Sequence, residues 1–161
     1  VGKCEQRLMD EHITLTRGIV RTLNNDLVDE NFNCMHWWTK KHNNYARREA
    51  TDILDKKYNL IGKRQIQRDV TIKQAFYKRI LKEKVYNKLP LGFRPAAYFF
   101  YRFIFQLGFL DGPKGWLFHF LQGFWYRLLV DINVWEIETQ AKGDRDRIRE
   151  VITKEWGIIL D

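Results

Sequence analysis

The amino-acid sequence predicts a mainly α-helical chain with a minor β element. Apolar residues recur at helical spacing over residues 34–58 and again over 143–161. Between these segments lie two almost wholly apolar stretches, residues 96–110 and 116–130, joined by a Gly- and Pro-containing turn. The β element is expected over residues 19–28, where Asn24 and Asn25 separate two apolar pairs and favour a turn between short strands.

Composition limits the class of protein. The chain has 161 residues, of which 45% are hydrophobic and 15% aromatic, and this excludes a disordered chain and suits one domain or a piece of a larger one. A formal net charge of +8 favours an anionic partner, such as acidic lipid, a phosphorylated substrate or nucleic acid. Cys4 and Cys34 lack C-x-x-C spacing and paired histidines, so a zinc site is not expected.

The first elements are expected to be short. Residues 4–17 mix acidic, basic and apolar side chains and predict a short helix that Gly18 ends. The strands of residues 19–28 would follow it. The chain begins with Val rather than Met and carries no signal peptide at its start, so we expect it to be a fragment of a longer protein.

Residues 34–58 predict one helix with two distinct faces. Ala46, Ala50, Ile53 and Leu54 recur at helical spacing and give a packing face. A second stripe consists of aromatic residues with polar tips and ends in a carboxylate: Trp38, His42, Tyr45 and Glu49. A further helix, dense in cations, is expected over residues 63–88 and ends at Leu89-Pro90.

The apolar stretches 96–110 and 116–130 predict a helical hairpin with its turn at residues 111–115. Each arm is shorter than the roughly 20 residues that cross a bilayer, and each carries an arginine, Arg102 or Arg127. A hairpin that lies in the headgroup region or dips into one leaflet is therefore favoured over a buried hairpin of a soluble core. Cations that would meet anionic lipid flank it: Lys82, Lys84, Lys88 and Arg94.

The last segment, residues 143–161, predicts an amphipathic helix. Its apolar residues follow helical spacing: Ile148, Val151, Ile152 and Trp156.

Two segments could carry chemistry. Asp10 and Glu11 form an acidic pair that could act as a general base, although adjacent acids are also common in solvated helix turns. His42, Asn43 and Tyr45 offer a donor, an amide and a phenol within one helical turn, beside cations that could hold phosphate oxygens. The alternative for this second segment is an amphipathic packing helix. The sequence contains no Gly-rich phosphate loop and no metalloprotease or serine-hydrolase motif.

Several of these segments resemble bacterial family 2 glycosyltransferases that build cell-surface polysaccharide. The run CEQRLMDEHITLTRG resembles the family segment that carries the catalytic acidic pair. HWWTKKHNNYARREA matches the family pattern W-x-x-K-H-N-x-Y-A-x-x-E-A, and the most specific match is G-F-L-D-G-x-x-G at residues 108–115. The resemblance extends to about Glu138.

The resemblance implies a particular fold and chemistry. The chain would be the carboxyl-terminal part of an α/β GT-A glycosyltransferase that uses a nucleotide-sugar donor and a divalent metal (Mg or Mn) and inverts the sugar carbon. Asp10 or Glu11 would be the general base, with Asp10 favoured. Substrate-binding residues would be Trp38, Lys41, His42, Asn43 and Tyr45. Residues 1–62 would end the catalytic domain, 63–138 would form a basic and aromatic membrane-surface region, and 139–161 a terminal amphipathic helix.

The resemblance also defines what this chain is expected to lack and to bind. In the family, the nucleotide-binding strands and the D-x-D metal motif precede the acidic pair, and residues 1–9 of this chain contain neither, so the chain is expected to bind no metal or donor and to be inactive without the amino-terminal half of the enzyme. Its acceptor would be a polysaccharide, lipopolysaccharide-type or lipid-linked saccharide at the cytoplasmic face of the inner membrane, where the enzyme would sit peripherally on anionic lipid.

Two hypotheses compete with a glycosyltransferase. A non-catalytic membrane-surface docking module would need the hairpin but not Asp10. Nucleic-acid binding is not expected, because the aromatic residues gather in apolar runs instead of alternating with cations.

Overall fold

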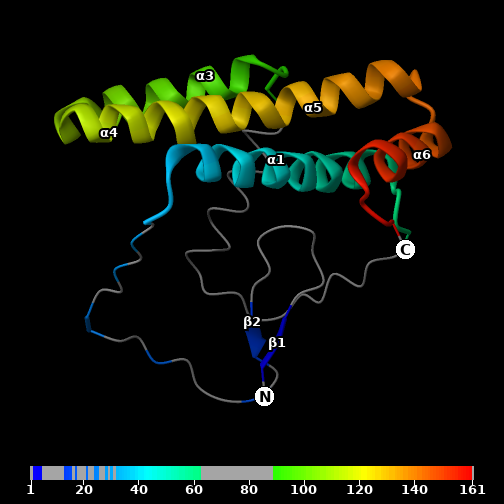
Figure 1. Cartoon of the computed structure of the whole chain (residues 1–161), viewed down its shortest axis with the longest axis horizontal. Coiled ribbons are helices and arrows are strands. Elements are labelled where there is room, and N and C mark those ends of the chain that lie inside the picture. Colours follow the sequence, from blue (N-terminus) through cyan, green and yellow to red (C-terminus); the bar gives the residue numbers. More distant parts are fainter. Residues whose placement is uncertain are drawn as a thin grey trace.

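The computed structural model describes residues 2–4, 13–15, 17, 21, 24–25, 28, 30, 32–62 and 89–160. These parts of the chain are mainly helical, as the sequence predicts, and Figure 1 shows the helices stacked in two layers. The helix expected over residues 63–88 lies outside the described residues, as do Asp10 and Glu11. The hairpin expected over residues 19–28 lies largely outside them.

Two short strands lie near the amino terminus. Strand β1 (Gly2–Cys4) pairs antiparallel with β2 (Ile13–Leu15), with Gly2 opposite Leu15. The helix predicted over residues 4–17 is therefore wrong at Ile13–Leu15. The physical reason is local, because the β-branched residues Ile13 and Thr14 favour extended backbone.

Helix α1 (Met35–Tyr58) confirms the helix predicted over residues 34–58. Its packing face is the expected one, since Ala46, Ala50 and Leu54 are fully buried. The helix ends at Asn59, which adopts a left-handed conformation and whose N–H donates to the Asp55 carbonyl.

The apolar stretches form a long helical hairpin, as predicted. The outgoing arm consists of α3 (Phe93–Phe100) and the π-helical η2 (Tyr101–Phe105). The returning arm consists of α4 (Gly112–Phe118), the π-helical η4 (His119–Trp125) and α5 (Tyr126–Ala141). Figure 1 shows the two arms side by side, with the α4 end extending beyond the start of α1.

The turn of the hairpin does not lie at residues 111–115, where the sequence predicted it. The chain reverses at Gln106 and Leu107 and continues through the 3₁₀-helix η3 (Gly108–Asp111). Leu107 adopts a left-handed conformation, with φ of 57°. Gly112 and Pro113 then begin α4, because proline fits the first turn of a helix, where its missing N–H has no partner to lose.

One hydrophobic core joins α1, α5 and α6 (Arg145–Trp156). The amphipathic helix predicted near the carboxyl terminus is confirmed, since Ile148 and Ile152 are fully buried. Asp144 caps this helix by accepting a hydrogen bond from the Arg147 N–H. The core spans the chain from α1 to its last described residue: Ala46, Ala50, Leu54, Leu60, Tyr126, Val130, Val134, Ile137, Ala141, Ile148, Ile152 and Leu160.

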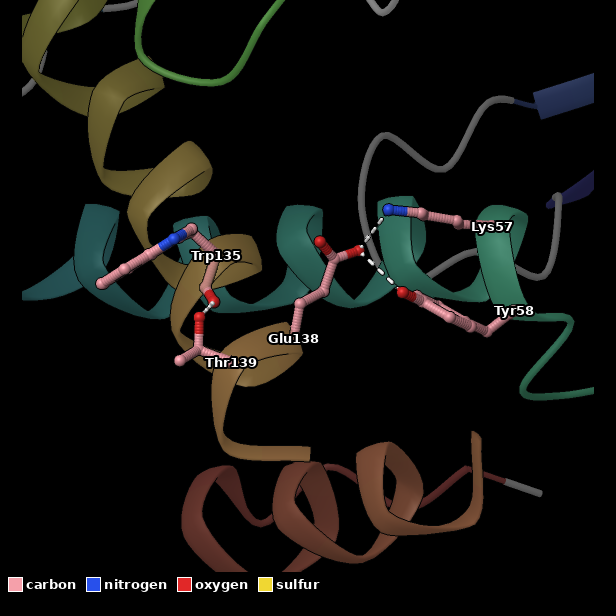
Figure 2. A network of polar contacts seen from close by, with 5 residues as sticks. All are labelled: Lys57, Tyr58, Trp135, Glu138 and Thr139. Atoms are coloured by element: carbon pink, nitrogen blue, oxygen red, sulfur yellow. Dashed lines mark hydrogen bonds and ion pairs between the residues drawn. The ribbon is translucent and has the colours of Figure 1, made fainter. Parts of the chain in front are cut away.

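A polar network ties the end of α1 to α5 (Figure 2). Glu138 accepts hydrogen bonds from Lys57 Nζ at 2.7 Å and from the Tyr58 hydroxyl at 3.2 Å. The hydrogen bond to Glu138 is the main cause that raises the pKa of Lys57 above its usual value, against a smaller opposing effect of burial. This network joins the last turn of α1 to the last turns of α5.

Among the described residues, no helix combines the length and the apolar character that crossing a bilayer requires.

Candidate functional site

The aromatic stripe predicted on α1 forms a stacked cluster. The rings of Trp38 and His42 lie 3.6 Å apart and nearly parallel, and the Tyr45 ring lies 5.8 Å from that of His42. His42 Nδ1 lies 2.8 Å from the Trp38 carbonyl oxygen. Because a carbonyl oxygen can only accept, Nδ1 carries the proton, and the orientation of the imidazole ring is fixed by its own helix.

This cluster faces the junction of η4 and α5. Tyr126 meets the His42 ring edge-on at 5.5 Å, and Trp125 lies 6.1 Å from Trp38. Trp38, His42 and Tyr45 therefore serve first as a helix–helix contact, which is the amphipathic-packing alternative that the sequence left open. Trp38 and His42 each present one ring face to the other, and Tyr45 packs against the hydrophobic core.

The carboxylate at the end of the stripe is also used between helices. Glu49 accepts a hydrogen bond from the Tyr126 hydroxyl at 2.8 Å, and its other oxygen lies 3.8 Å from Arg127 Nη1. The Arg127 guanidinium in turn lies 4.9 Å from the centre of the Tyr98 ring. The sequence pattern placed Glu49 at the end of the stripe but did not identify its partners, Tyr126 and Arg127.

Lys41 and Asn43 occupy the rim of the cluster. Lys41 Nζ lies 4.8 Å from the centre of the Trp37 ring and 5.4 Å from that of Tyr45. Asn43 is exposed, because it follows His42 directly and so lies about 100° around the helix from it. Trp37 is itself 39% exposed. The predicted binding residues thus divide into a packed set (Trp38, His42 and Tyr45) and a rim set, in which Lys41 is half-buried and Asn43 is exposed.

The G-F-L-D-G-x-x-G element builds the end of the hairpin. Asp111 Oδ2 lies 2.9 Å from Nε2 of His119, which is buried between the two arms. A Cβ at Gly108 would lie 2.6 Å from that same nitrogen, and a Cβ at Gly115 would overlap Asp111 Cβ. Gly112 has a φ of +71°, which glycine adopts without strain. This element therefore has a structural role in closing the turn.

Arg94 was expected to meet anionic lipid, and this is wrong. Its side chain is only 3% exposed and forms an ion pair with Asp131, which is 2% exposed. Arg94 Nε donates to Asp131 Oδ1 at 2.6 Å, and the Gly92 N–H donates to Oδ2 at 2.8 Å. The pair fastens the start of α3 to the middle of α5, and a buried carboxylate so satisfied holds the arginine away from any external anion. The other expected lipid-facing cations, Lys82, Lys84 and Lys88, lie outside the described residues.

The described residues contain no group of three or more His, Cys, Asp or Glu side chains that could hold a metal ion. The residues that do occur together near α1 are aromatic rings, one carboxylate and cations. Comparison with protein-family models, with curated proteins and with solved structures finds no match to this chain.

Proposed function

We propose that this chain is the carboxyl-terminal part of a family 2 glycosyltransferase that works at a membrane surface. The observation that carries the proposal is the apolar end of the hairpin, where large side chains from both arms and the turn are exposed instead of buried. Such a surface on a basic protein suits an enzyme whose acceptor is held by a membrane. The sequence resemblance supplies the reaction class.

In the proposed reaction, a carboxylate of the acidic pair, Asp10 or Glu11, takes the proton from an acceptor hydroxyl. The hydroxyl oxygen forms a bond to the anomeric carbon of the donor sugar as the bond from that carbon to the diphosphate oxygen breaks, with inversion. The carboxylate must lie within hydrogen-bond distance of the hydroxyl for this proton transfer. The amino-terminal half of the longer enzyme would bind the nucleotide-sugar.

The rim set on α1, together with Trp37, is the part of this chain best suited to contact the acceptor. The exposed face of Trp37 can pack on the C–H face of a sugar ring, and Lys41 and Asn43 can bind its oxygens or a phosphate. The packed set would hold this surface in place, since Trp38 and His42 are stacked on each other and contact Trp125 and Tyr126 of the returning arm, and Tyr45 packs against the hydrophobic core.

The proposal is tested with Asp10→Asn and Glu11→Gln variants of the longer enzyme and a panel of nucleotide-sugars. Loss of the general base should lower the rate of sugar transfer roughly a hundredfold or more in one variant, while folding is unchanged. The other variant serves as the matched control, because it neutralises an adjacent carboxylate. Full activity in both variants would contradict the assignment of the acidic pair.

The second candidate is a non-catalytic membrane-docking module, which the same exposed hairpin end favours. It predicts that both acidic-pair variants behave as wild type while changes in the hairpin remove membrane attachment.

A further inference from the structure

The end of the hairpin carries an unusually large exposed apolar surface. We call residues 100–118 the hairpin tip. Ten large apolar side chains of the tip are each at least 46% exposed. With about 200 Å² for a typical large side chain, half exposed, they present on the order of 1,000 Å², against roughly 300–600 Å² for the largest patch of an ordinary monomer. They are Phe100, Tyr101, Ile104, Phe105, Leu107, Phe109, Leu110, Trp116, Leu117 and Phe118.

This surface surrounds the tip instead of covering one side of it. In the returning arm, Trp116, Leu117 and Phe118 are consecutive and all exposed, and successive residues of a helix point about 100° apart. The turn adds Leu107, the outgoing arm contributes exposed residues of its own, and the tip lies beyond the start of α1 (Figure 1). A protein partner would cover one face of such a hairpin, whereas an apolar medium would cover every face at once.

The charges of the tip favour an anionic medium. Its ionisable residues of fixed charge are the cations Arg102 and Lys114 and the carboxylate Asp111, which contacts His119 but is 60% exposed, so positive charge exceeds negative charge by one. Arg102 lies against the rings of Tyr98 and Phe118, at 5.8 and 5.6 Å from their centres. Lys114 is exposed on the first turn of α4. Neither cation is buried, so both can meet phosphate groups while the apolar side chains pass below them.

We propose that the hairpin tip enters the boundary between headgroups and acyl chains of an anionic lipid bilayer, with the turn foremost. Phe105, Leu107 and Leu110 would lie deepest, while Tyr101 and Trp116 would lie at headgroup level, where their polar atoms remain hydrated. The inference deepens the proposed function by naming the partner of this surface, and it rests on that function only in placing the chain at a membrane.

The test is sedimentation of the 161-residue chain with vesicles of phosphatidylcholine, with and without phosphatidylglycerol. We expect binding that requires the anionic lipid and weakens with salt. Phe105→Ser should lower the partition coefficient about tenfold, and Phe105→Ser with Leu110→Ser about a hundredfold. The matched control is Phe93→Ser, which removes an equally apolar ring, 61% exposed, from the other end of the same hairpin. It should change binding less than twofold.

Several results would overturn the proposal. The first is absence of binding to either kind of vesicle. The second is a loss of vesicle binding in the Phe93→Ser control equal to that in Phe105→Ser, which would mean that the hairpin lies flat on the surface. The third is a dimer that forms through the tip and is detected by sedimentation velocity without lipid. Should the double variant not fold, quenching of tryptophan fluorescence by brominated lipid in wild type and Trp116→Phe decides instead. Quenching that Trp116→Phe does not reduce would refute insertion of the tip. Vesicle binding involves no sugar transfer, so the two tests are independent. The chain can fail to bind vesicles while the acidic-pair variants confirm sugar transfer, or it can bind vesicles while those variants contradict sugar transfer.

Discussion

Replacement of Asp131 by alanine should lower the free energy of unfolding of this protein by a large fraction. Asp131 is 2% exposed and accepts from Arg94 Nε at 2.6 Å and from the Gly92 N–H at 2.8 Å. Its removal leaves the Arg94 guanidinium buried without its carboxylate, which typically costs about 3–5 kcal/mol. Because the net stability of a domain is about 5–15 kcal/mol, the loss should be evident in any unfolding measurement.

Urea unfolding followed by circular dichroism measures this loss. With an m-value of about 2 kcal/mol per M, a change of about 4 kcal/mol lowers the midpoint by about 2 M. Glu136→Ala is the matched control, since it removes an exposed acid from the same helix and should change stability by less than about 0.5 kcal/mol.

A double variant distinguishes the cost of a buried charge without its counterion from the cost of lost packing. Arg94→Met with Asp131→Leu removes both charges and should recover at least half of the lost stability, because an apolar pair needs no counterion. Full recovery is not expected, since the Gly92 N–H still loses its acceptor, at a cost of about 1–3 kcal/mol. A loss below about 1 kcal/mol in Asp131→Ala, or a double variant no more stable than the single one, would refute this account of the pair.

Two further predictions concern the hairpin turn and the network of Figure 2. Gly115→Ala should lower stability by about 1–3 kcal/mol in thermal unfolding, because its Cβ would overlap Asp111. Gly123→Ala is the control: its Cβ would have no atom within 4 Å, so the change should be neutral or stabilising. Equal effects of the two substitutions would contradict the close contact at Gly115. Lys57→Met should lower stability by less than about 1 kcal/mol, because Lys57 is mostly exposed. Because the pKa of Lys57 is raised in the folded state, the stability that Lys57 contributes is complete below its usual pKa of 10.5 and is lost as pH rises through the folded-state pKa. The stabilities of wild type and variant should therefore converge in alkali. A difference in stability that grows there would contradict this linkage.

The helices of this protein follow from local pattern wherever one face is buried. Ala46, Ala50 and Leu54 in α1, and Ile148 and Ile152 in α6, recur at the spacing that brings them to one side, and all five are fully buried. The hairpin was equally predictable, since two apolar stretches of similar length flank turn-forming residues.

The position of the turn was not predictable from the same residues. Gly112 and Pro113 are turn formers by composition, yet here they begin a helix, and the reversal depends on left-handed Leu107. A leucine in that conformation is uncommon and leaves no mark in the sequence. The next residue, Gly108, lies so close to His119 of the returning arm that a Cβ there would be 2.6 Å from its Nε2, a contact between residues 11 apart in the sequence.

The candidate site was predicted in part for a similar reason. The stripe Trp38, His42 and Tyr45 was visible as one face of a helix, but its partners Trp125 and Tyr126 lie more than one element away in the sequence. Arg94 shows the same limit, because a cation beside an apolar run favours a surface role until Asp131, on another helix, is seen to bury it. Long-range ion pairs have no local signature.

The most direct test of the central proposal is transfer of a labelled sugar from nucleotide-sugar donors to a membrane saccharide fraction by the proposed parent glycosyltransferase. We predict that wild type labels the saccharide, and that Asp10→Asn or Glu11→Gln lowers the rate roughly a hundredfold with folding intact. Failure of the wild-type enzyme to transfer sugar from any donor, or undiminished transfer by both variants, would contradict the proposal.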